Sequence, residues 1–361
     1  MSTGPVVIAG GGTGGHVYPA LALAEELVAR GHARDDVRFV GARRGLEARV
    51  VPGAGFPVEL LPGRGIERRL SLRNIRSVLE ILRACVVALG LMRRWHPRVV
   101  VGVGGYASVP AVLAARLRRI PVVVHEQNAA PGIANRLAVR LGAVPAVSLP
   151  DTPLPGAVLT GNPVRREVLS VERRPDTTRP RLAVVGGSLG ARRLNDAALG
   201  LYDRWRERRD VTIRHVAGSR DFDRCSGSLD TLRRPDDALV YELVDYEDHM
   251  DTLYATSSLV VSRAGAVTVA ELTAAGVPSV LVPFPAATGD HQTHNARVVE
   301  EAGGAVLLAD SDCDAASLEP IVDGILGSPA RIRAMTEATR SLARPDAVSD
   351  LADLVEEAAR A

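Results

Sequence analysis

Two segments of this 361-residue chain share a pattern that restricts its fold more than any other feature. Residues 5–9 form an apolar run, residues 10–15 contain five glycines, and a helical segment follows at 18–30. The same order returns with the apolar run 181–185, the glycine-containing turn 186–190 and a further helical segment. An apolar strand, a glycine turn and a helix open a Rossmann-like unit, so the two openings predict two Rossmann-like domains.

Further short runs rich in Val, Ile and Leu lie between helical stretches. They are continuous in their apolar character, as expected for parallel strands that are buried on both faces. The expected strands are residues 37–40, 99–103, 121–125, 212–216, 259–262 and 279–282. The chain is therefore predicted to have an α/β fold with two doubly wound parallel sheets.

Proline-containing segments on either side of Asn162-Pro163 mark the expected boundary between the domains. We expect residues 1–161 to form an N-terminal domain and residues 162–345 to form a C-terminal domain. The remaining residues, 346–361, have the pattern of one amphipathic helix.

Composition excludes two classes of enzyme. The sequence contains no lysine, so all 44 basic residues are arginines. A Walker-type phosphate loop and a pyridoxal Schiff base both need a lysine, and neither is expected here. The cysteines Cys85, Cys225 and Cys313 are far apart and form no CxxC pattern, as expected of reduced thiols. No compact metal-ligand cluster and no nucleic-acid partner are expected.

Two features argue against insertion into a membrane. The N-terminal segment lacks the basic and apolar regions of a signal peptide. The most apolar helical stretch, residues 78–92, is interrupted by Glu80 and Arg83, which leaves it too short and too charged to span a bilayer.

Charge is distributed unevenly along the chain. Residues 1–161 contain 20 arginines and 10 acidic residues, whereas residues 162–361 contain 24 arginines and 32 acidic residues. This asymmetry suggests that the first half faces an anionic partner.

Residues 64–98 concentrate this charge, with nine arginines and only two acidic residues. Apolar residues recur there at steps of three and four, which predicts an amphipathic helix. They are Leu72, Ile75, Leu79, Leu82, Val86 and Leu89. We expect most of this stripe to pack in the core, while the arginines form a rim that attaches reversibly to an anionic membrane surface.

The first glycine run fits the G-x-G-x-x-G pattern, in which backbone N–H groups approach a phosphate at a helix start. A dehydrogenase would carry an acid about 20 residues further on to bind a ribose. Here the strand 37–40 ends in Gly41-Ala42-Arg43, which leaves only an NADP-dependent version open. His16 follows the glycines, either as a reactive imidazole or as an exposed residue at a helix start.

Three further motifs carry polar side chains at expected strand ends. The stretch 102–108 is glycine-rich and is either a ligand loop or only a tight turn. The stretch 262–271 ends in Glu271, which can either accept from a pair of sugar hydroxyls or lie solvated on a helix face. Asp290-His291-Gln292 is a polar cluster of the kind that hydrogen-bonds sugar hydroxyls.

These motifs occur together in one order that also includes residues 125–128 (HEQN) and 161–165 (GNPVR). The ordered set closely resembles the MurG family, from Val6 to about Pro345. These bacterial enzymes transfer N-acetylglucosamine (GlcNAc) from UDP-GlcNAc to lipid-linked N-acetylmuramyl (MurNAc)-pentapeptide in peptidoglycan synthesis. The resemblance implies a GT-B fold, with two Rossmann-like domains facing across a cleft, and a reaction that needs no metal or other cofactor.

The resemblance also implies a site. Arg165 and the backbone of Tyr246 and Glu247 would lie by the uracil, and Glu271 would hold the ribose. The other donor-binding residues would be Thr13, Gly14, Gly15, Asn128, Ser188, Ala266, Val267, Thr268, His291 and Gln292. Ser188 and residues 266–268 would face the diphosphate. The acceptor would meet Gly12, His16, Gly104, Gly105 and Tyr106. The helix 346–361 would cross back to the N-terminal domain.

The implied reaction is attack of the MurNAc C4 hydroxyl on the anomeric carbon of GlcNAc, with inversion to a β-1,4 product. His16 is the first candidate for the general base and the Glu126 carboxylate is the second. Backbone N–H groups and helix dipoles would stabilise the leaving diphosphate.

The resemblance places the protein peripherally on the cytoplasmic face of the cell membrane, with cell-wall synthesis proteins as further partners. The alternatives are a GT-B relative with another lipid or small-molecule acceptor, an NADP-dependent oxidoreductase and a non-catalytic sugar-nucleotide binder.

Overall fold

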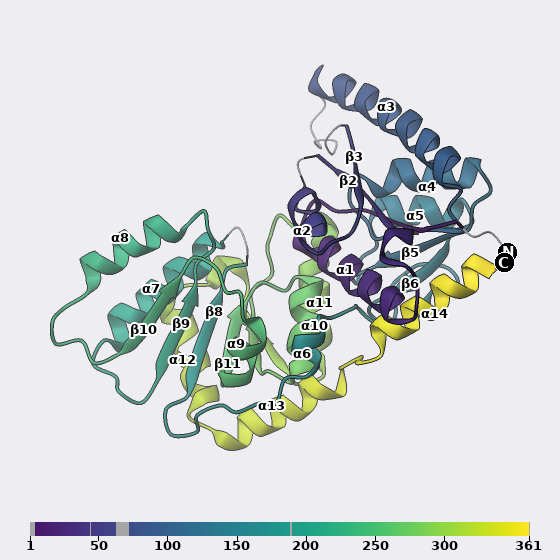
Figure 1. The fold of residues 1–361 in the computed structure, drawn as a ribbon. Helices are drawn as coiled ribbons and strands as arrows, with labels where there is room; N and C mark the ends of the chain where they lie inside the picture. Colours follow the sequence, from purple (N-terminus) through teal and green to yellow (C-terminus); the bar gives the residue numbers. More distant parts are fainter. Residues whose placement is uncertain (1–3, 44, 63–71, 188–189, 361) are drawn as a thin grey trace. The chain divides into compact units, whose positions relative to one another are not determined.

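The computed structural model describes residues 4–43, 45–62, 72–187 and 190–360. The chain divides into two compact units. The N-terminal unit comprises Met1–Arg165 together with Pro345–Ala361, and the C-terminal unit comprises Arg166–Arg344. Each unit contains one parallel sheet flanked by helices, which confirms the predicted fold class (Figure 1).

The sheet of the N-terminal unit has the order β3-β2-β1-β4-β5-β6-β7, and every neighbouring pair is parallel. Its strands are β1 (Val6–Ala9), β2 (Val37–Ala42), β3 (Val58–Leu61), β4 (Val99–Gly102), β5 (Val122–Glu126), β6 (Val144–Val147) and β7 (Val158–Leu159). Its helices are α1 (Gly14–Ala29), α2 (Glu47–Gly53), α3 (Leu72–Trp95), α4 (Ser108–Leu117), α5 (Ile133–Arg140) and α14 (Ala347–Arg360).

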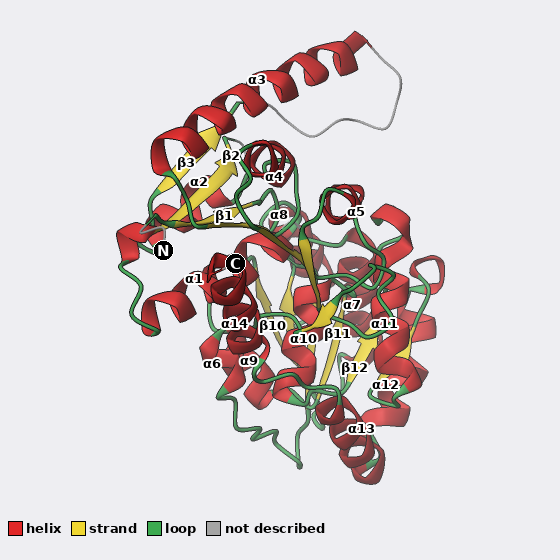
Figure 2. Cartoon of the chain, turned by 90° about the vertical axis from the view of Figure 1, so that its right-hand side faces the viewer, coloured by secondary structure: helices red, strands yellow, loops and turns green. Residues whose placement is uncertain are grey.

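Successive residues of β1 point to opposite faces of this sheet, so the strand contributes to two apolar clusters. Val6 and Ile8 lie in a cluster with residues of α1, α2 and α14. Val7 and Ala9 lie in a second cluster with residues of α3, α4 and α5. Helices therefore cover both faces of the sheet, as a doubly wound fold requires (Figure 2).

The sheet of the C-terminal unit has the order β10-β9-β8-β11-β12-β13 and is also parallel throughout. Its strands are β8 (Arg181–Val185), β9 (Thr212–Val216), β10 (Val240–Val244), β11 (Leu259–Ser262), β12 (Ser279–Leu281) and β13 (Ala305–Leu307). Its helices are α6 (Arg166–Leu169), α7 (Arg192–Trp205), α8 (Phe222–Leu232), α9 (Met250–Thr256), α10 (Ala266–Ala275), α11 (His291–Glu301), α12 (Ala315–Leu326) and α13 (Pro329–Ser341).

The C-terminal helix α14 packs against α1 of the N-terminal unit (Figure 1). Leu351 and Val355 are completely buried in this contact. At its edge the Arg30 guanidinium donates to the Asp353 carboxylate at 2.5 Å and to the Ser349 hydroxyl at 2.7 Å. The chain thus returns to its first unit after completing the second.

The expectation that the apolar stripe of residues 64–98 packs mainly in the core is wrong for the described side chains. Leu82 and Val86 are 56% and 71% exposed, and Leu89 is also exposed. Ala84 and Ala88 are buried instead, because these small residues let α3 approach α4 closely. The side chains of Leu72, Ile75 and Leu79 lie outside the described residues.

Within the described part of the chain, no helix is both long and apolar enough to cross a bilayer.

In each unit the strand order reverses between the two strands at the centre of the sheet, β1 and β4 in one and β8 and β11 in the other. Ligands of open parallel sheets bind outside the carboxyl ends of the strands at such points.

Candidate active site

The loops that follow β1 and β4 touch backbone to backbone. The Gly11 N–H donates to the Gly104 carbonyl at 3.3 Å, and the Val103 N–H donates to the Ala9 carbonyl at 2.9 Å. A Cβ atom at Gly105, where φ is +80°, would overlap the Gly11 carbonyl. Only glycine fits this position, so the two predicted acceptor loops form one surface.

His16 lies in the first turn of α1, with its ring against the second loop. A Cβ atom at Gly104 would lie 2.9 Å from two atoms of the ring, so a side chain there would displace the imidazole. The His16 Nδ1 lies 3.3 Å from the Thr13 hydroxyl. The imidazole is therefore packed between the two glycine loops and is only partly exposed.

Tyr106 ties the second loop to the end of β3, because its hydroxyl donates to the Pro62 carbonyl at 3.1 Å. Burial raises the pKa of Tyr106, and the nearby Glu80 and Cys85 raise it further. The phenol is thus a neutral donor whose proton is already engaged, and acceptor contact through Tyr106 stays a prediction.

The HEQN motif at the end of β5 is buried and internally hydrogen-bonded. Gln127 Nε2 donates to the Val103 carbonyl at 3.0 Å and lies 3.1 Å from His125 Nδ1. His125 Nε2 lies 3.0 Å from the Gly161 carbonyl. Burial lowers the pKa of His125, so the ring is neutral and donates to this carbonyl. The motif thereby joins β5 to the loop after β4 and to the segment after β7.

Glu126 anchors the loop that begins at Gln127. One carboxylate oxygen accepts from the Asn128 N–H at 3.1 Å and from its side-chain amide at 3.3 Å. The other accepts from the Gly132 N–H at 2.9 Å and from Asn135 Nδ2 at 2.8 Å. These contacts favour a structural role over proton transfer. The base role of Glu126 and donor contact by Asn128 both stay predictions.

Glu47 is a site residue that the sequence reasoning missed. It is only 2% exposed, and its carboxylate accepts from the N–H groups of Gly12 and Ala42, each at 2.7 Å. We expected the Gly12 N–H to face the acceptor, but it donates its hydrogen bond to the Glu47 side chain. The sequence feature that could have identified Glu47 is its place as an acidic residue a few positions after the end of a strand, instead of directly at that end.

In the C-terminal unit, α10 begins directly after the turn that follows β11. The first hydrogen bond of this helix runs from the Val269 N–H to the Gly265 carbonyl at 2.9 Å. The N–H groups of Ala266, Val267 and Thr268 precede it and have no acceptor within the helix. Together with the helix dipole they favour an anion, as predicted for the donor diphosphate. Ser188 lies outside the described residues.

Glu271 lies in the second turn of α10 and is 5% exposed. Its carboxylate accepts from the hydroxyl of Tyr254, a buried residue of α9, at 3.0 Å. The alternative of a solvated helix-face carboxylate is therefore wrong. A buried carboxylate fixed by a phenol is suited to accept from further hydroxyls.

The polar cluster at the start of α11 is held to the loops around it. The Gln292 side-chain oxygen accepts from the Phe284 N–H at 2.9 Å, which leaves its amide N–H groups as donors. Asn295 Nδ2 donates to the Ala264 carbonyl at 3.1 Å and so ties α11 to the turn before α10. His291 is the first residue of the helix and is partly exposed.

The residues predicted near the uracil are spread over several elements. Glu247 accepts from two nitrogens of Arg214 on β9, at 2.8 and 3.1 Å. Tyr246 is exposed, and its N–H donates to the Asp245 carboxylate. Arg165 belongs to the N-terminal unit, where its guanidinium lies 5.4 Å from the centre of the Tyr18 ring. Uracil contact by these residues stays a prediction.

A buried polar chain lies beneath the turn that follows β8. The Tyr241 hydroxyl lies 2.7 Å from His215 Nδ1, and His215 Nε2 lies 2.9 Å from Asn195 Oδ1. Burial lowers the pKa of His215 to about 4, with a further contribution from Arg224, so this ring is also neutral. Asn195 in turn donates to the Ala217 carbonyl at 3.0 Å. Sequence reasoning missed this chain because its members are far apart in sequence.

Among the described residues, no group of three or more His, Cys, Asp or Glu side chains is arranged to hold a metal ion. The polar groups gathered at the strand ends are instead N–H donors, carboxylates and one packed imidazole. This set is suited to binding phosphates and sugar hydroxyls and to transferring a proton.

Comparison with known proteins places the chain in a family. Residues 6–143 match the glycosyltransferase family 28 N-terminal domain, and residues 181–351 match the C-terminal domain of the same family. The chain belongs to glycosyltransferase family 28.

Several curated members of family 28 match over nearly their whole length. All three described here are named UDP-N-acetylglucosamine--N-acetylmuramyl-(pentapeptide) pyrophosphoryl-undecaprenol N-acetylglucosamine transferase. That of Desulforudis audaxviator is 40% identical and covers 98% of both chains. That of Anaeromyxobacter dehalogenans is 41% identical over 98% of this chain and 93% of its own. That of Alkalilimnicola ehrlichii is 42% identical over 99% of this chain and 100% of its own.

Solved structures agree with the family 28 assignment. The crystal structure of Acinetobacter baumannii MurG superposes with a TM-score of 0.78 at 29% identity, covering 98% of this chain and 99% of that one. The calicheamicin glycosyltransferase CalG4 superposes with a TM-score of 0.69 at 18% identity, covering 99% of this chain and 98% of that one. The second match concerns the fold alone. The resemblance to the MurG family inferred from the motifs is confirmed.

The environment of Glu271 generates a prediction. Glu271→Ala should weaken binding of UDP-GlcNAc by about 1.5–3 kcal/mol, because a buried hydrogen bond to a charged group is lost. Tyr254→Phe should weaken it less, since the carboxylate remains but loses one donor. Calorimetric titration with UDP and the Michaelis constant for UDP-GlcNAc measure both effects. Glu301→Ala, which removes an exposed carboxylate of α11, is the matched control. Unchanged UDP binding in Glu271→Ala would remove this residue from the donor site.

Proposed function

We propose that this protein transfers GlcNAc from UDP-GlcNAc to the C4 hydroxyl of MurNAc in undecaprenyl-diphosphate-linked MurNAc-pentapeptide. The product is the lipid-linked disaccharide precursor of peptidoglycan. The observation that carries this function is the match of 40–42% identity over nearly the full length of enzymes named for this reaction.

We assign the donor to the C-terminal unit. The unpaired N–H groups at the start of α10 would bind the diphosphate, and Glu271 would accept from the ribose hydroxyls. The amide N–H groups of Gln292 would donate to the GlcNAc hydroxyls, with His291 beside them. The support is that both polar side chains are fixed by neighbours, Glu271 by the Tyr254 hydroxyl and Gln292 by the Phe284 N–H.

We assign the acceptor and the general base to the N-terminal unit. The C4 hydroxyl attacks the anomeric carbon on the face opposite UDP, so the α-linked donor gives a β-1,4 product. The His16 imidazole takes the hydroxyl proton, because an imidazole titrates near neutral pH and His16 is packed between the two glycine loops.

The departing UDP carries the charge that develops on the diphosphate. In this proposal backbone N–H groups and the dipole of α10 stabilise that charge, and no resident metal or organic cofactor takes part. The support is the geometry of the turn before α10, where N–H groups without an acceptor in the helix are gathered.

The oxidoreductase alternative is disfavoured by Glu47. In a dinucleotide-binding fold the N–H groups of the first glycine loop approach a pyrophosphate. Here the Gly12 N–H donates to the Glu47 carboxylate and is not available to a pyrophosphate. A relative acting on another lipid or small-molecule acceptor and a non-catalytic sugar-nucleotide binder are the other two alternatives.

Transfer of radiolabel tests the proposed function. We expect label from UDP-GlcNAc to appear in a short-chain lipid-linked MurNAc-pentapeptide incubated with the purified protein. Calorimetric titration should show binding of UDP and none of NADPH. Tighter binding of NADPH than of UDP would contradict the assignment, and transfer only to other acceptors would favour the relative that acts on another acceptor.

The base role of His16 predicts a selective loss of turnover. His16→Ala and His16→Gln should both lower kcat by about 10²–10⁴-fold, because neither side chain can take a proton. The Michaelis constant for UDP-GlcNAc should change little, since His16 lies on the acceptor side. In the unsubstituted protein the rate should fall with decreasing pH, because a protonated imidazole cannot accept the proton. Near-native turnover in His16→Gln would transfer the base role to another group, with Glu126→Gln tested next.

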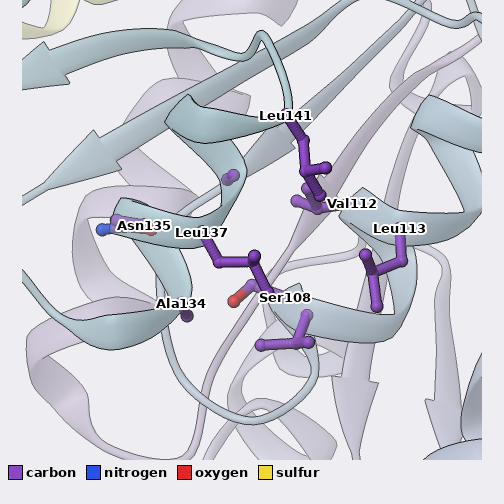
Figure 3. A pocket seen from close by; sticks show the side chains of 9 residues that line it. Ser108, Val112, Leu113, Ala134, Asn135, Leu137 and Leu141 are labelled. Atoms are coloured by element: carbon purple, nitrogen blue, oxygen red, sulfur yellow. The ribbon is translucent and has the colours of Figure 1, made fainter. Parts of the chain in front are cut away.

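We also propose peripheral attachment of the N-terminal unit to the anionic cytoplasmic face of the cell membrane. The adjacent helices α3, α4 and α5 expose large apolar side chains, including Leu117 at 77% and Ile133 at 72%. Between α4 and α5, Leu113, Leu137 and Leu141 line an apolar pocket (Figure 3). Lipid is the partner that we assign to this surface, because the acceptor of the proposed reaction is lipid-linked and arginines flank the apolar residues in the sequence. They are Arg83, Arg93, Arg94, Arg116, Arg118, Arg119, Arg136 and Arg140.

Vesicle co-sedimentation tests this attachment. Binding should require anionic lipid and fall at high salt, since each arginine near an anionic surface contributes about 1 kcal/mol. Arg83→Glu with Arg93→Glu, two exposed arginines of α3, is the variant of choice. It should weaken vesicle binding without changing UDP affinity, whereas Arg333→Glu in the C-terminal unit should change neither. Equal binding to anionic and zwitterionic vesicles would refute the electrostatic part.

A further inference from the structure

The buried side chain of Glu47 fills a space lined by glycines. Glu47 is the first residue of α2, and it lies beneath the first glycine loop. Cβ atoms at Gly11, Gly41 and Gly45 would each overlap the Glu47 side chain. The absence of side chains at these three positions is therefore what makes room for the carboxylate.

Both oxygens of the Glu47 carboxylate hold backbone. One accepts from the Gly12 N–H and the other from the Ala42 N–H, each at 2.7 Å. Bonds between N–H groups and an ionised carboxylate are short and stronger than neutral ones. The side chain thus bridges the loop after β1 to the last residue of β2.

The loop that Glu47 holds has little conformational preference of its own. Gly10, Gly11 and Gly12 have φ values of +155°, +141° and +99°, a region that only glycine enters readily. Beyond a Cβ built at Gly12 there is no atom within 4 Å, so the outer side of the loop is open. The Glu47 carboxylate is a fixed contact on its inner side, immediately before Thr13 and the first turn of α1.

We propose that Glu47 is a positioning residue for the acceptor half of the site. By fixing Gly12 it sets where α1 begins, and hence where the His16 imidazole stands against Gly104. This inference rests on the proposed function, because the acceptor and the base role of His16 are taken from it. Glu47 touches neither ligand and acts through the backbone of the loop.

Glu47→Gln is the sharpest test, because it keeps the volume and removes one acceptor. One of the two N–H groups then faces an N–H₂ group and loses its bond. We expect kcat for transfer to fall at least about tenfold, since small displacements of reacting groups are costly. The Michaelis constant for UDP-GlcNAc and the affinity for UDP should stay within about twofold, because Glu271, Gln292 and the start of α10, to which we assign the donor, belong to the other unit.

Two further variants test whether the length of the Glu47 side chain matters as well as its charge, and whether loss of any nearby carboxylate has the same effect. Glu47→Asp keeps the charge but is one methylene shorter, so it should recover only part of the turnover. Glu25→Gln removes an exposed carboxylate of α1 and should leave turnover unchanged. Hydrogen exchange, read peptide by peptide, should accelerate in residues 10–16 of Glu47→Gln and stay unchanged in the C-terminal unit.

Two outcomes would overturn the inference. In one, Glu47→Gln turns over as fast as the unsubstituted protein. In the other, its lower turnover comes with an equal loss of UDP affinity and faster exchange throughout the chain. If the unsubstituted protein transferred no GlcNAc at all, the proposed function would fail. The exchange of residues 10–16 would still decide whether Glu47 holds the loop.

Discussion

The contact on which the candidate site depends is the approach of two strand-end loops in each sheet, after β1 and β4 in one unit and after β8 and β9 in the other. In the N-terminal unit Gly105 meets the backbone of Gly11, and in the C-terminal unit Gly218 meets the backbone of Gly190. A side chain at either position would separate the loops. Glycine has little conformational preference, so polar side chains from other elements hold the backbone of these loops. They are Glu47 in one unit and Asn195 in the other. Close packing of bare backbone and a few buried hydrogen bonds together create the surfaces to which we assign the ligands.

The central strands were predictable because a strand buried on both faces is a continuous apolar run. The strands β3, β6, β7, β10 and β13 were missed, because they lie toward the sheet edges and are short or carry polar residues such as Glu59 and Glu242. The inward face of α3 was also mispredicted. A hydrophobic pattern favours large residues for the core, whereas the close contact with α4 selects Ala84 and Ala88.

The site was only partly predictable, since motifs identify loops but not what lies under them. Glu271 is buried and accepts from Tyr254, which comes from a preceding helix and carries no signal of its own. Glu47 was missed because we looked for an acidic residue at the end of β2. Glu47 is instead the first residue of α2, and its carboxylate accepts from the last residue of β2. The HEQN motif was recognised as a marker, yet its spacing does not show that His125 contacts the segment after β7 and Gln127 the loop after β4.

The return of α14 to the N-terminal unit gives the polypeptide an order of assembly. Leu351 and Val355 complete the apolar cluster formed by α1 and β1, yet they are translated after every residue of the C-terminal unit. Domains fold as units while synthesis proceeds from the N-terminus. A nascent chain therefore carries an uncovered apolar strip along α1 until residues 347–360 leave the ribosome. A polypeptide cut before residue 347 would keep that strip exposed, as a surface for chaperones and for aggregation.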